Sequence, residues 1–217
     1  MKRRNKVVLS FDLDFTLIDN REGIINSFNY ALKKYNLQQI DSLEIEKMIG
    51  TPLDNMFAKV TDLNPSLLIS AFREYYGSKG IFEVRLLPGV RKKLKELGNT
   101  FIMGVITLKK QEMALKLLNY LELDYYFDYI LGETDYIKSK TDLRLKTYLV
   151  KKYPNHNFVV IGDHPNDNEL AEMLDCPFIG VLTGYHTDKQ LRQDNNSQVL
   201  ILNNINELTK DKINSLF

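Results

Sequence analysis

Two aspartates and a hydroxyl group follow directly on an apolar run near the start of the chain. The run Val7–Phe11 leads into Asp12, Asp14 and Thr16. If the run is a strand, alternate side chains leave on the same side, so that Asp12 and Asp14 project together from its carboxyl end. Two like charges at this spacing resist ionising together, and a divalent cation relieves the repulsion. Carboxylate and phosphate oxygens are ligands that suit Mg²⁺, so the segment predicts a metal and phosphate site at the tip of a strand.

The two carboxylates have chemically distinct expected roles. Asp12 is the candidate nucleophile, because a carboxylate can attack phosphorus and form an aspartyl phosphate. Asp14 is the candidate acid and base, which would protonate the leaving oxygen and later deprotonate the attacking water. The alternative is an aspartate turn that merely ends a strand. Thr16 is a further candidate for contact with the substrate.

Polar groups also follow later apolar runs, at Thr107, Lys140, Asp163 and Asp167. Thr107 would donate its hydroxyl to a phosphoryl oxygen, and Lys140 would neutralise charge on that group and on Asp12. Asp163 is the candidate metal ligand beside Asp12, and Asp167 would bind the metal through water or orient Lys140. Each has a plainer alternative: Thr107 as a helix cap, Lys140 as a solvated side chain, and the two aspartates as a turn with a cap.

Alternating strands and helices predict how these groups meet. Such alternation indicates a parallel sheet with helices on both faces, which binds ligands beyond the carboxyl ends of its strands. The predicted strands cover residues 6–11, 101–107, 129–131, 158–161, 178–181 and 199–201, and the predicted helices between them include 110–120, 141–152 and 169–174.

A helical block interrupts this alternation directly after the first strand. Start signals recur at Asp19 with Glu22, at Asp41 with Glu44 and at Asn64-Pro65, and Gly50 is a predicted helix stop. No strand pattern occurs between about residue 20 and residue 83. The chain is therefore predicted to have an α/β core with a helical insertion.

Taken together, four segments closely resemble the motifs of the haloacid dehalogenase superfamily of phosphotransferases. The segments occur in the expected order and are Asp12-Leu13-Asp14-Phe15-Thr16-Leu17, Ile106-Thr107, Lys140-Thr141-Asp142-Leu143 and Gly162-Asp163-His164-Pro165-Asn166-Asp167. The third motif often continues Lys-Pro in that family, and neither Lys138 nor Lys140 precedes a proline here. Lys140 is preferred, because Lys-Thr-Asp-Leu opening a helix is similar to a form without proline.

The resemblance implies a Rossmann-like doubly wound parallel core, Mg²⁺ dependence and an aspartyl-phosphate mechanism. The metal ligands that it implies are Asp12, the backbone carbonyl of Asp14, and Asp163. It also implies an all-helical cap at residues 19–83, which closes over the substrate, inserted into a core of residues 1–18 and 84–217. Within that cap, Asn20 and Thr51 are candidate contacts for the substrate.

The layout is most similar to the phosphoglycolate phosphatase group, with nucleotidases and pyrophosphatases of similar build as alternatives. Asp14 argues against the dehalogenase branch. A sugar-phosphate mutase similar to β-phosphoglucomutase is another alternative, although the loop Gly50-Thr51-Pro52-Leu53 lacks the arginine that such mutases tend to carry. A non-catalytic binding module is the least favoured interpretation, because no motif residue is replaced.

Composition restricts the binding partners and the cellular compartment that can be expected. The 217 residues are 44% hydrophobic, carry a formal net charge of +1 and include one cysteine. The low net charge provides no general attraction to nucleic acid or to an anionic membrane, and no apolar run is long enough to cross one. A single cysteine favours a reducing compartment. We therefore expect a cytoplasmic monomer or homodimer that acts on a small phosphorylated metabolite.

Overall fold

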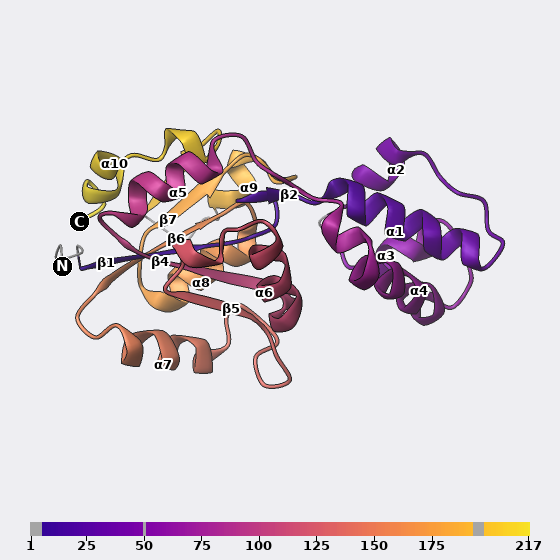
Figure 1. Ribbon diagram of the computed structural model, residues 1–217, viewed down its shortest axis with the longest axis horizontal. Helices are drawn as coiled ribbons and strands as arrows, with labels where there is room; N and C mark the ends of the chain where they lie inside the picture. Colours follow the sequence, from indigo (N-terminus) through magenta and orange to yellow (C-terminus); the bar gives the residue numbers. More distant parts are fainter. Residues whose placement is uncertain (1–5, 50, 193–197) are drawn as a thin grey trace. The chain divides into compact units, whose positions relative to one another are not determined.

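The computed structural model describes residues 6–49, 51–192 and 198–217, which form two compact units (Figure 1). One unit comprises Met1–Ile18 and Leu86–Phe217, and the other comprises Asp19–Arg85. The second boundary thus lies two residues beyond the predicted end at residue 83. The predicted helix stop at Gly50 lies outside the described residues.

The larger unit is built on a six-stranded parallel sheet with the strand order β5-β4-β1-β6-β7-β8. This confirms the predicted α/β class. Central strand β1 is buried along its whole length and pairs with β4 on one side and β6 on the other. The strands are β1 (Val7–Phe11), β4 (Ile102–Lys110), β5 (Tyr129–Glu133), β6 (Asn157–Gly162), β7 (Phe178–Val181) and β8 (Val199–Leu202).

Helices cover both faces of the sheet. The connections that contain α5 and α6 lead across the sheet from β1 toward β5, and those that contain α7 and α8 lead in the opposite direction, toward β7. Because such connections are right-handed, α5 and α6 lie on one face of the sheet, and α7 and α8 lie on the other. The helices are α5 (Val90–Gly98), α6 (Gln111–Tyr120), α7 (Leu143–Lys152), α8 (Pro165–Leu174), α9 (Asp188–Arg192) and α10 (Lys210–Asn214), with short 3-10 turns η2 (Asp124–Tyr126) and η3 (Ile205–Glu207).

Apolar side chains from sheet and helices form a continuous core on the α7 and α8 face. Val8 and Val160 of the sheet pack in one cluster with Leu145 and Leu149 of α7 and Leu170 of α8. Strands that are buried on both faces read as nearly unbroken apolar runs, which explains why they were recognisable in the sequence. This packing holds the carboxyl ends of β1, β4 and β6 at a common edge.

The smaller unit is helical, as the sequence predicts. Asp41 caps α2 by accepting a hydrogen bond from the Leu43 amide, and Pro65 begins α4 after the Asn64 cap. Its centre contains the stacked rings of Phe28 and Phe57, with centroids 4.2 Å apart. The helices are α1 (Arg21–Lys34), α2 (Ser42–Glu46), α3 (Leu53–Ala58) and α4 (Pro65–Ser78), followed by the 3-10 turn η1 (Gly80–Phe82).

One predicted helix cap in this unit is wrong, although a helix does begin there, at Arg21. Asp19 does not form a capping box with Glu22, because Asn20 is the cap residue of α1. The Asp19 carboxylate instead pairs with Arg21 at 2.6 Å and Arg85 at 2.9 Å. Asp19 and Arg85 belong to the short strands β2 (Ile18–Asp19) and β3 (Arg85–Leu86), which form a separate two-stranded sheet.

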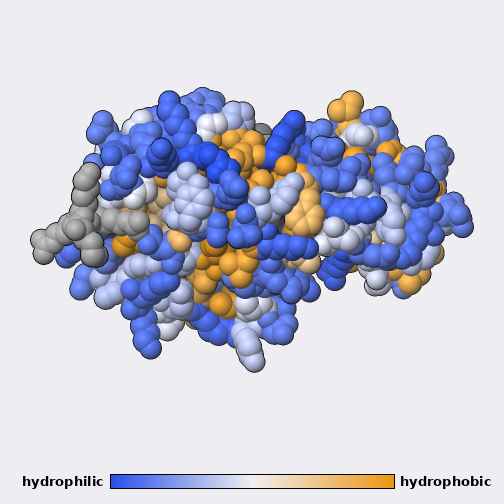
Figure 2. All heavy atoms as spheres, in the orientation of Figure 1, coloured by the Kyte–Doolittle hydropathy of each residue, from blue (hydrophilic) through white to orange (hydrophobic). Residues whose placement is uncertain are grey.

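Hydrophilic side chains cover most of the visible face of each unit, and apolar side chains show between them, chiefly in the middle of the larger unit (Figure 2). Among the described residues, no helix has the length and apolar character needed to span a bilayer.

Candidate active site

Strand β1 ends at Phe11 and delivers Asp12 to the edge of the sheet. The Asp12 amide donates to the carbonyl oxygen of Ile161 in β6 at 2.8 Å, which fixes the backbone where the strand ends. The Asp12 side chain is only 8% exposed. A carboxylate held this rigidly in a buried position is suited to an oriented attack on a bound substrate.

Lys140 contacts two of the candidate carboxylates at once. Its Nζ lies 2.5 Å from Oδ1 of Asp12 and 2.5 Å from Oδ1 of Asp167, and all three side chains are buried. Lys138, the competing lysine, is 59% exposed and pairs with Glu133 at 3.1 Å. The geometry therefore favours Lys140 as the lysine of the site.

Asp167 lies in the first turn of helix α8, whereas the predicted helix began only at residue 169. Helix α8 begins at Pro165 and not at Glu169, because proline is favoured at the first helical position. His164 is the cap residue: its Nδ1 accepts from the Asn166 amide at 3.0 Å, and its own amide donates to Oδ2 of Asp167 at 3.1 Å. Asp167 therefore uses one oxygen to cap the helix and the other to hold Lys140.

Asp163 follows β6 and is enclosed from two sides. Thr16 donates its hydroxyl to Oδ1 of Asp163 at 3.1 Å. On the other side, a Cβ atom added to Gly184 would lie 1.9 Å from Oδ2 of Asp163, so the backbone after β7 approaches the carboxylate closely. Glycine at this position leaves the space that the carboxylate fills.

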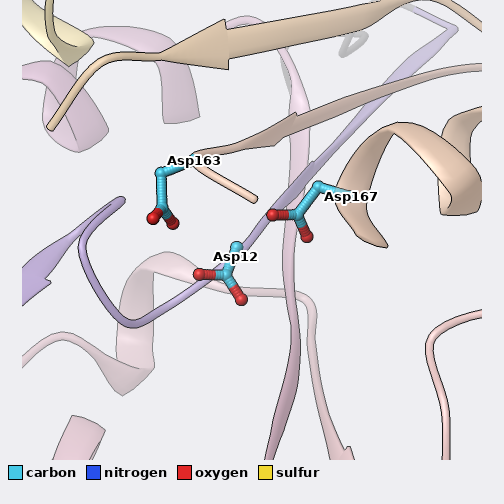
Figure 3. A group of neighbouring side chains, drawn as sticks. All are labelled: Asp12, Asp163 and Asp167. Carbon is cyan, nitrogen blue, oxygen red and sulfur yellow. The ribbon is translucent and has the colours of Figure 1, made fainter. Parts of the chain in front are cut away.

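Three carboxylates converge at this edge, and Figure 3 shows them grouped together. Asp12, Asp163 and Asp167 are buried and each offers a ligand oxygen, all within 4.8 Å of one another. With every carboxylate ionised, one lysine leaves two negative charges unbalanced. Two buried negative charges carried by carboxylate oxygens, which are hard ligands, fit a divalent cation such as Mg²⁺.

The pKa values reflect this crowding. Burial, with the charges of Asp167 and Asp14, raises the pKa of Asp12 to about 7 despite the opposing charge of Lys140. Burial and the charge of Asp12 likewise raise the pKa of Asp163 well above its usual range. Burial opposes the charge of Lys140, but Asp12 and Asp167 outweigh it and raise the pKa of that ammonium. Lys140 is thus a permanent cation among carboxylates that need a further positive charge.

Two histidines lie beside the acidic cluster. Burial, reinforced by the charge of His186, lowers the pKa of His164 to about 4, so its ring is neutral near pH 7. This state agrees with an Nδ1 that accepts the helix-capping hydrogen bond. The two rings meet edge to face with centroids 4.3 Å apart.

Asp14 and Thr107 lie nearby and contact Lys109, which is not among the predicted site residues. Nζ of Lys109 is 3.3 Å from Oδ1 of Asp14. The Lys109 amide donates to the Thr107 hydroxyl oxygen at 3.2 Å, which leaves the hydroxyl proton of Thr107 able to point to a ligand. Lys109 lies outside the predicted strand, which ended at residue 107, whereas β4 continues to Lys110.

Asn20 and Thr51 lie in the helical unit. There Asn20 donates to the Tyr76 hydroxyl at 3.3 Å, and Thr51 donates to the Met48 carbonyl at 2.7 Å. Their role in substrate binding and the function of the helical unit as a cap stay predictions.

A cavity of about 880 Å³ lies elsewhere in the core unit. Asn157, Pro177 and Gln198 line it, and these residues stand at or before the beginnings of β6, β7 and β8. The cavity is therefore at the amino-terminal edge of the sheet. The candidate catalytic and metal-binding side chains lie at the carboxyl-terminal edge, where open parallel sheets bind ligands.

Known proteins share this arrangement over most of the chain. Residues 9–181 match the model of the haloacid dehalogenase-like hydrolases. A phosphoglycolate phosphatase of Photorhabdus laumondii is 27% identical over 206 residues, covering 88% of this chain and 87% of the relative. A 5'-nucleotidase of Pseudomonas aeruginosa is 28% identical over 188 residues, covering 84% of this chain and 85% of the relative. The structure of a haloacid dehalogenase-like family protein from Streptococcus pneumoniae aligns with a TM-score of 0.78 at 26% identity, covering 89% of this chain and 92% of that one. The chain therefore belongs to the haloacid dehalogenase-like hydrolase family.

Proposed function

We propose that this hydrolase is a Mg²⁺-dependent phosphatase, similar to the phosphoglycolate phosphatases, that hydrolyses a small phosphate monoester through an aspartyl phosphate on Asp12. The observation that carries the proposal is the position of Asp12. It is buried, touches the Lys140 ammonium at 2.5 Å and lies within metal-sharing distance of Asp163. A nucleophile, a fixed cation and a further carboxylate thus meet at one point.

The proposed metal ligands are Asp12, the backbone carbonyl of Asp14, and Asp163. Both oxygens of Asp167 already have partners, Lys140 and the His164 amide, so Asp167 is assigned to hold Lys140 and to reach the metal through water. Bound Mg²⁺ would neutralise the excess negative charge and stabilise the charge that develops on the phosphoryl oxygens.

In the first step, a carboxylate oxygen of Asp12 forms a bond to phosphorus while the bond from phosphorus to the leaving oxygen breaks. The carboxyl group of Asp14 gives its proton to that oxygen, and the alcohol departs. Lys140 and the Thr107 hydroxyl offset the charge on the phosphoryl group in the transition state.

In the second step, a water oxygen attacks phosphorus and the bond to Asp12 breaks. The Asp14 carboxylate, now deprotonated, accepts the proton of the water, and inorganic phosphate leaves. Asp14 is thereby returned to its starting protonation state, and Asp12 is a free carboxylate again.

The test is phosphate release from a panel of phosphoglycolate, nucleoside monophosphates, sugar phosphates and pyrophosphate, with and without Mg²⁺. We expect Mg²⁺-dependent release from at least one of them and a phosphorylated enzyme after rapid acid quench. Asp12→Asn is expected to abolish both signals. Asp175→Asn is the matched control, because Asp175 has a left-handed backbone conformation at the end of α8 that asparagine also adopts readily.

Two results would contradict the proposal. One is a folded protein that releases no phosphate from any compound in the panel. The other is an Asp12→Asn variant that keeps its turnover. Isomerised sugar phosphate formed without phosphate release would point to a phosphomutase instead.

A further inference from the structure

Lys109 occupies an irregular part of strand β4, next to the candidate acid and base. The pairing of β4 with β5 shifts register between Ile106 and Lys110. Such irregularities redirect side chains and recur beside active sites. Here the result is a lysine that is only 10% exposed, with Nζ 3.3 Å from Oδ1 of Asp14.

Asp14 lies in a tight turn whose backbone is restrained. The Phe15 amide donates to the Ile18 carbonyl at 2.7 Å, and Phe15 has a positive φ of 58°. The Asp14 side chain, however, remains 27% exposed, whereas that of Asp12 is 8% exposed. Its two side-chain torsions therefore decide where the proton is offered. The Lys109 ammonium can donate to the carbonyl oxygen of the protonated carboxyl group as well as to the carboxylate, so the contact with this nearly buried lysine restricts both torsions.

We infer that Lys109 is a positioning residue, which holds the Asp14 carboxyl group in line with the leaving oxygen. The inference rests on the proposed function, because it concerns the proton that Asp14 transfers. It assigns no bond-making role to Lys109. Since a displacement of about 1 Å can cost roughly 10²-fold in rate, a loosely held Asp14 would deliver its proton poorly.

The leaving group distinguishes this role from a merely structural one. An alkoxide needs the proton from Asp14 when the phosphorus–oxygen bond breaks, whereas a nitrophenolate departs without it. The test therefore compares kcat/KM, which reports phosphoryl transfer to Asp12, for an alkyl phosphate and for p-nitrophenyl phosphate. For Lys109→Met we expect kcat/KM to fall about 10- to 100-fold on the alkyl phosphate and much less on the aryl phosphate. The loss is smaller than the roughly 10²- to 10⁴-fold of general acid catalysis as a whole, because Asp14 is misplaced and not removed.

A double-mutant cycle then asks whether Lys109 acts through Asp14. In an Asp14→Asn background, Lys109→Met should cause little further loss, because two residues that act on one step are not additive. Lys109→Arg keeps the charge and should restore part of the activity on the alkyl phosphate. Lys110→Met is the matched control: it removes the same charge from the next residue, which is exposed.

Equal losses on both substrates, or an undiminished effect of Lys109→Met in the Asp14→Asn background, would overturn the inference while leaving the phosphatase assignment intact. If the unaltered enzyme with Mg²⁺ hydrolyses neither compound nor any member of the substrate panel, both the phosphatase assignment and the inference fail.

Discussion

Replacing Lys140 by methionine removes the cation between Asp12 and Asp167 but keeps most of the side-chain volume. Lys140 contacts both carboxylates at 2.5 Å, and all three side chains are buried. In the variant, Asp12, Asp163 and Asp167 would face one another without any positive charge from Lys140. The protein should therefore lose stability, most strongly when Mg²⁺ is absent and the carboxylates are ionised.

The size of the loss follows from the burial of the pair. Removing one partner of a buried ion pair costs about 3–5 kcal/mol. For 150–250 residues, each kcal/mol lowers Tm by about 2–4 °C, so a decrease of about 6–20 °C is expected. Lys138→Met is the control, because its exposed pair with Glu133 contributes about 0–1 kcal/mol.

The pH dependence has a definite sign. Burial already raises the pKa of Asp12 to about 7, and losing Lys140 raises it further. Between the unfolded and folded pKa values the folded variant binds more protons, so its stability rises as the pH falls. The opposite contributions of His164 and His186, whose pKa values are lowered, occur in both proteins and largely cancel in the comparison.

The assay is thermal unfolding of the unaltered protein and both variants at pH 8 and pH 5.5, with and without Mg²⁺. The Tm deficit of Lys140→Met should be largest at pH 8 without Mg²⁺ and should shrink on acidification or on adding Mg²⁺. A deficit no larger than that of Lys138→Met, or one independent of pH, would refute the assignment of Lys140 to a buried acidic centre.

Three further outcomes are expected. Because burial raises the pKa of Asp12 to about 7, protons should compete with Mg²⁺ for this carboxylate below that pH. Mg²⁺ affinity should then fall about tenfold per pH unit for each proton displaced, and calorimetry that shows no pH dependence of the affinity would contradict this. Gly184→Ala places a Cβ atom 1.9 Å from Oδ2 of Asp163, so the carboxylate must move. Mg²⁺ affinity should fall about 10- to 100-fold, whereas unchanged affinity would argue against Asp163 as a ligand. Asp167→Asn keeps an oxygen for the helix cap but loses the charged acceptor of Lys140, so kcat should fall by roughly 10²-fold; steady-state kinetics with normal turnover would remove Asp167 from the site.

Local sequence patterns were sufficient for most of the elements. The apolar run before Asp12, the proline at the start of α4 and the alternation after residue 86 each depend on neighbours in the chain, and the structure contains the corresponding elements. The wrong predictions concern residues at which another local signal or a distant partner decides the structure. Pro165 marks the true start of α8, and Asp19 pairs with Arg85, which is 66 residues away, in preference to capping α1.

Residues 6–183 were sufficient to identify the candidate groups and their order along the chain. They also showed that these groups follow strands, because the end of a strand and the start of a helix are properties of short segments. The preference for Lys140 over Lys138 rested on the resemblance to the family motif, and the contact of Lys140 with Asp12 and Asp167 is visible only in the folded chain. The pairing of Lys109 with Asp14 was not readable from the sequence. Lys140 and Asp12 are 128 residues apart in the chain, and their contact exists only because β1 and the segment after β5 end at the same edge of the sheet. The raised pKa of Asp12 has the same origin, since burial and the charges of distant residues arise only when the chain is folded.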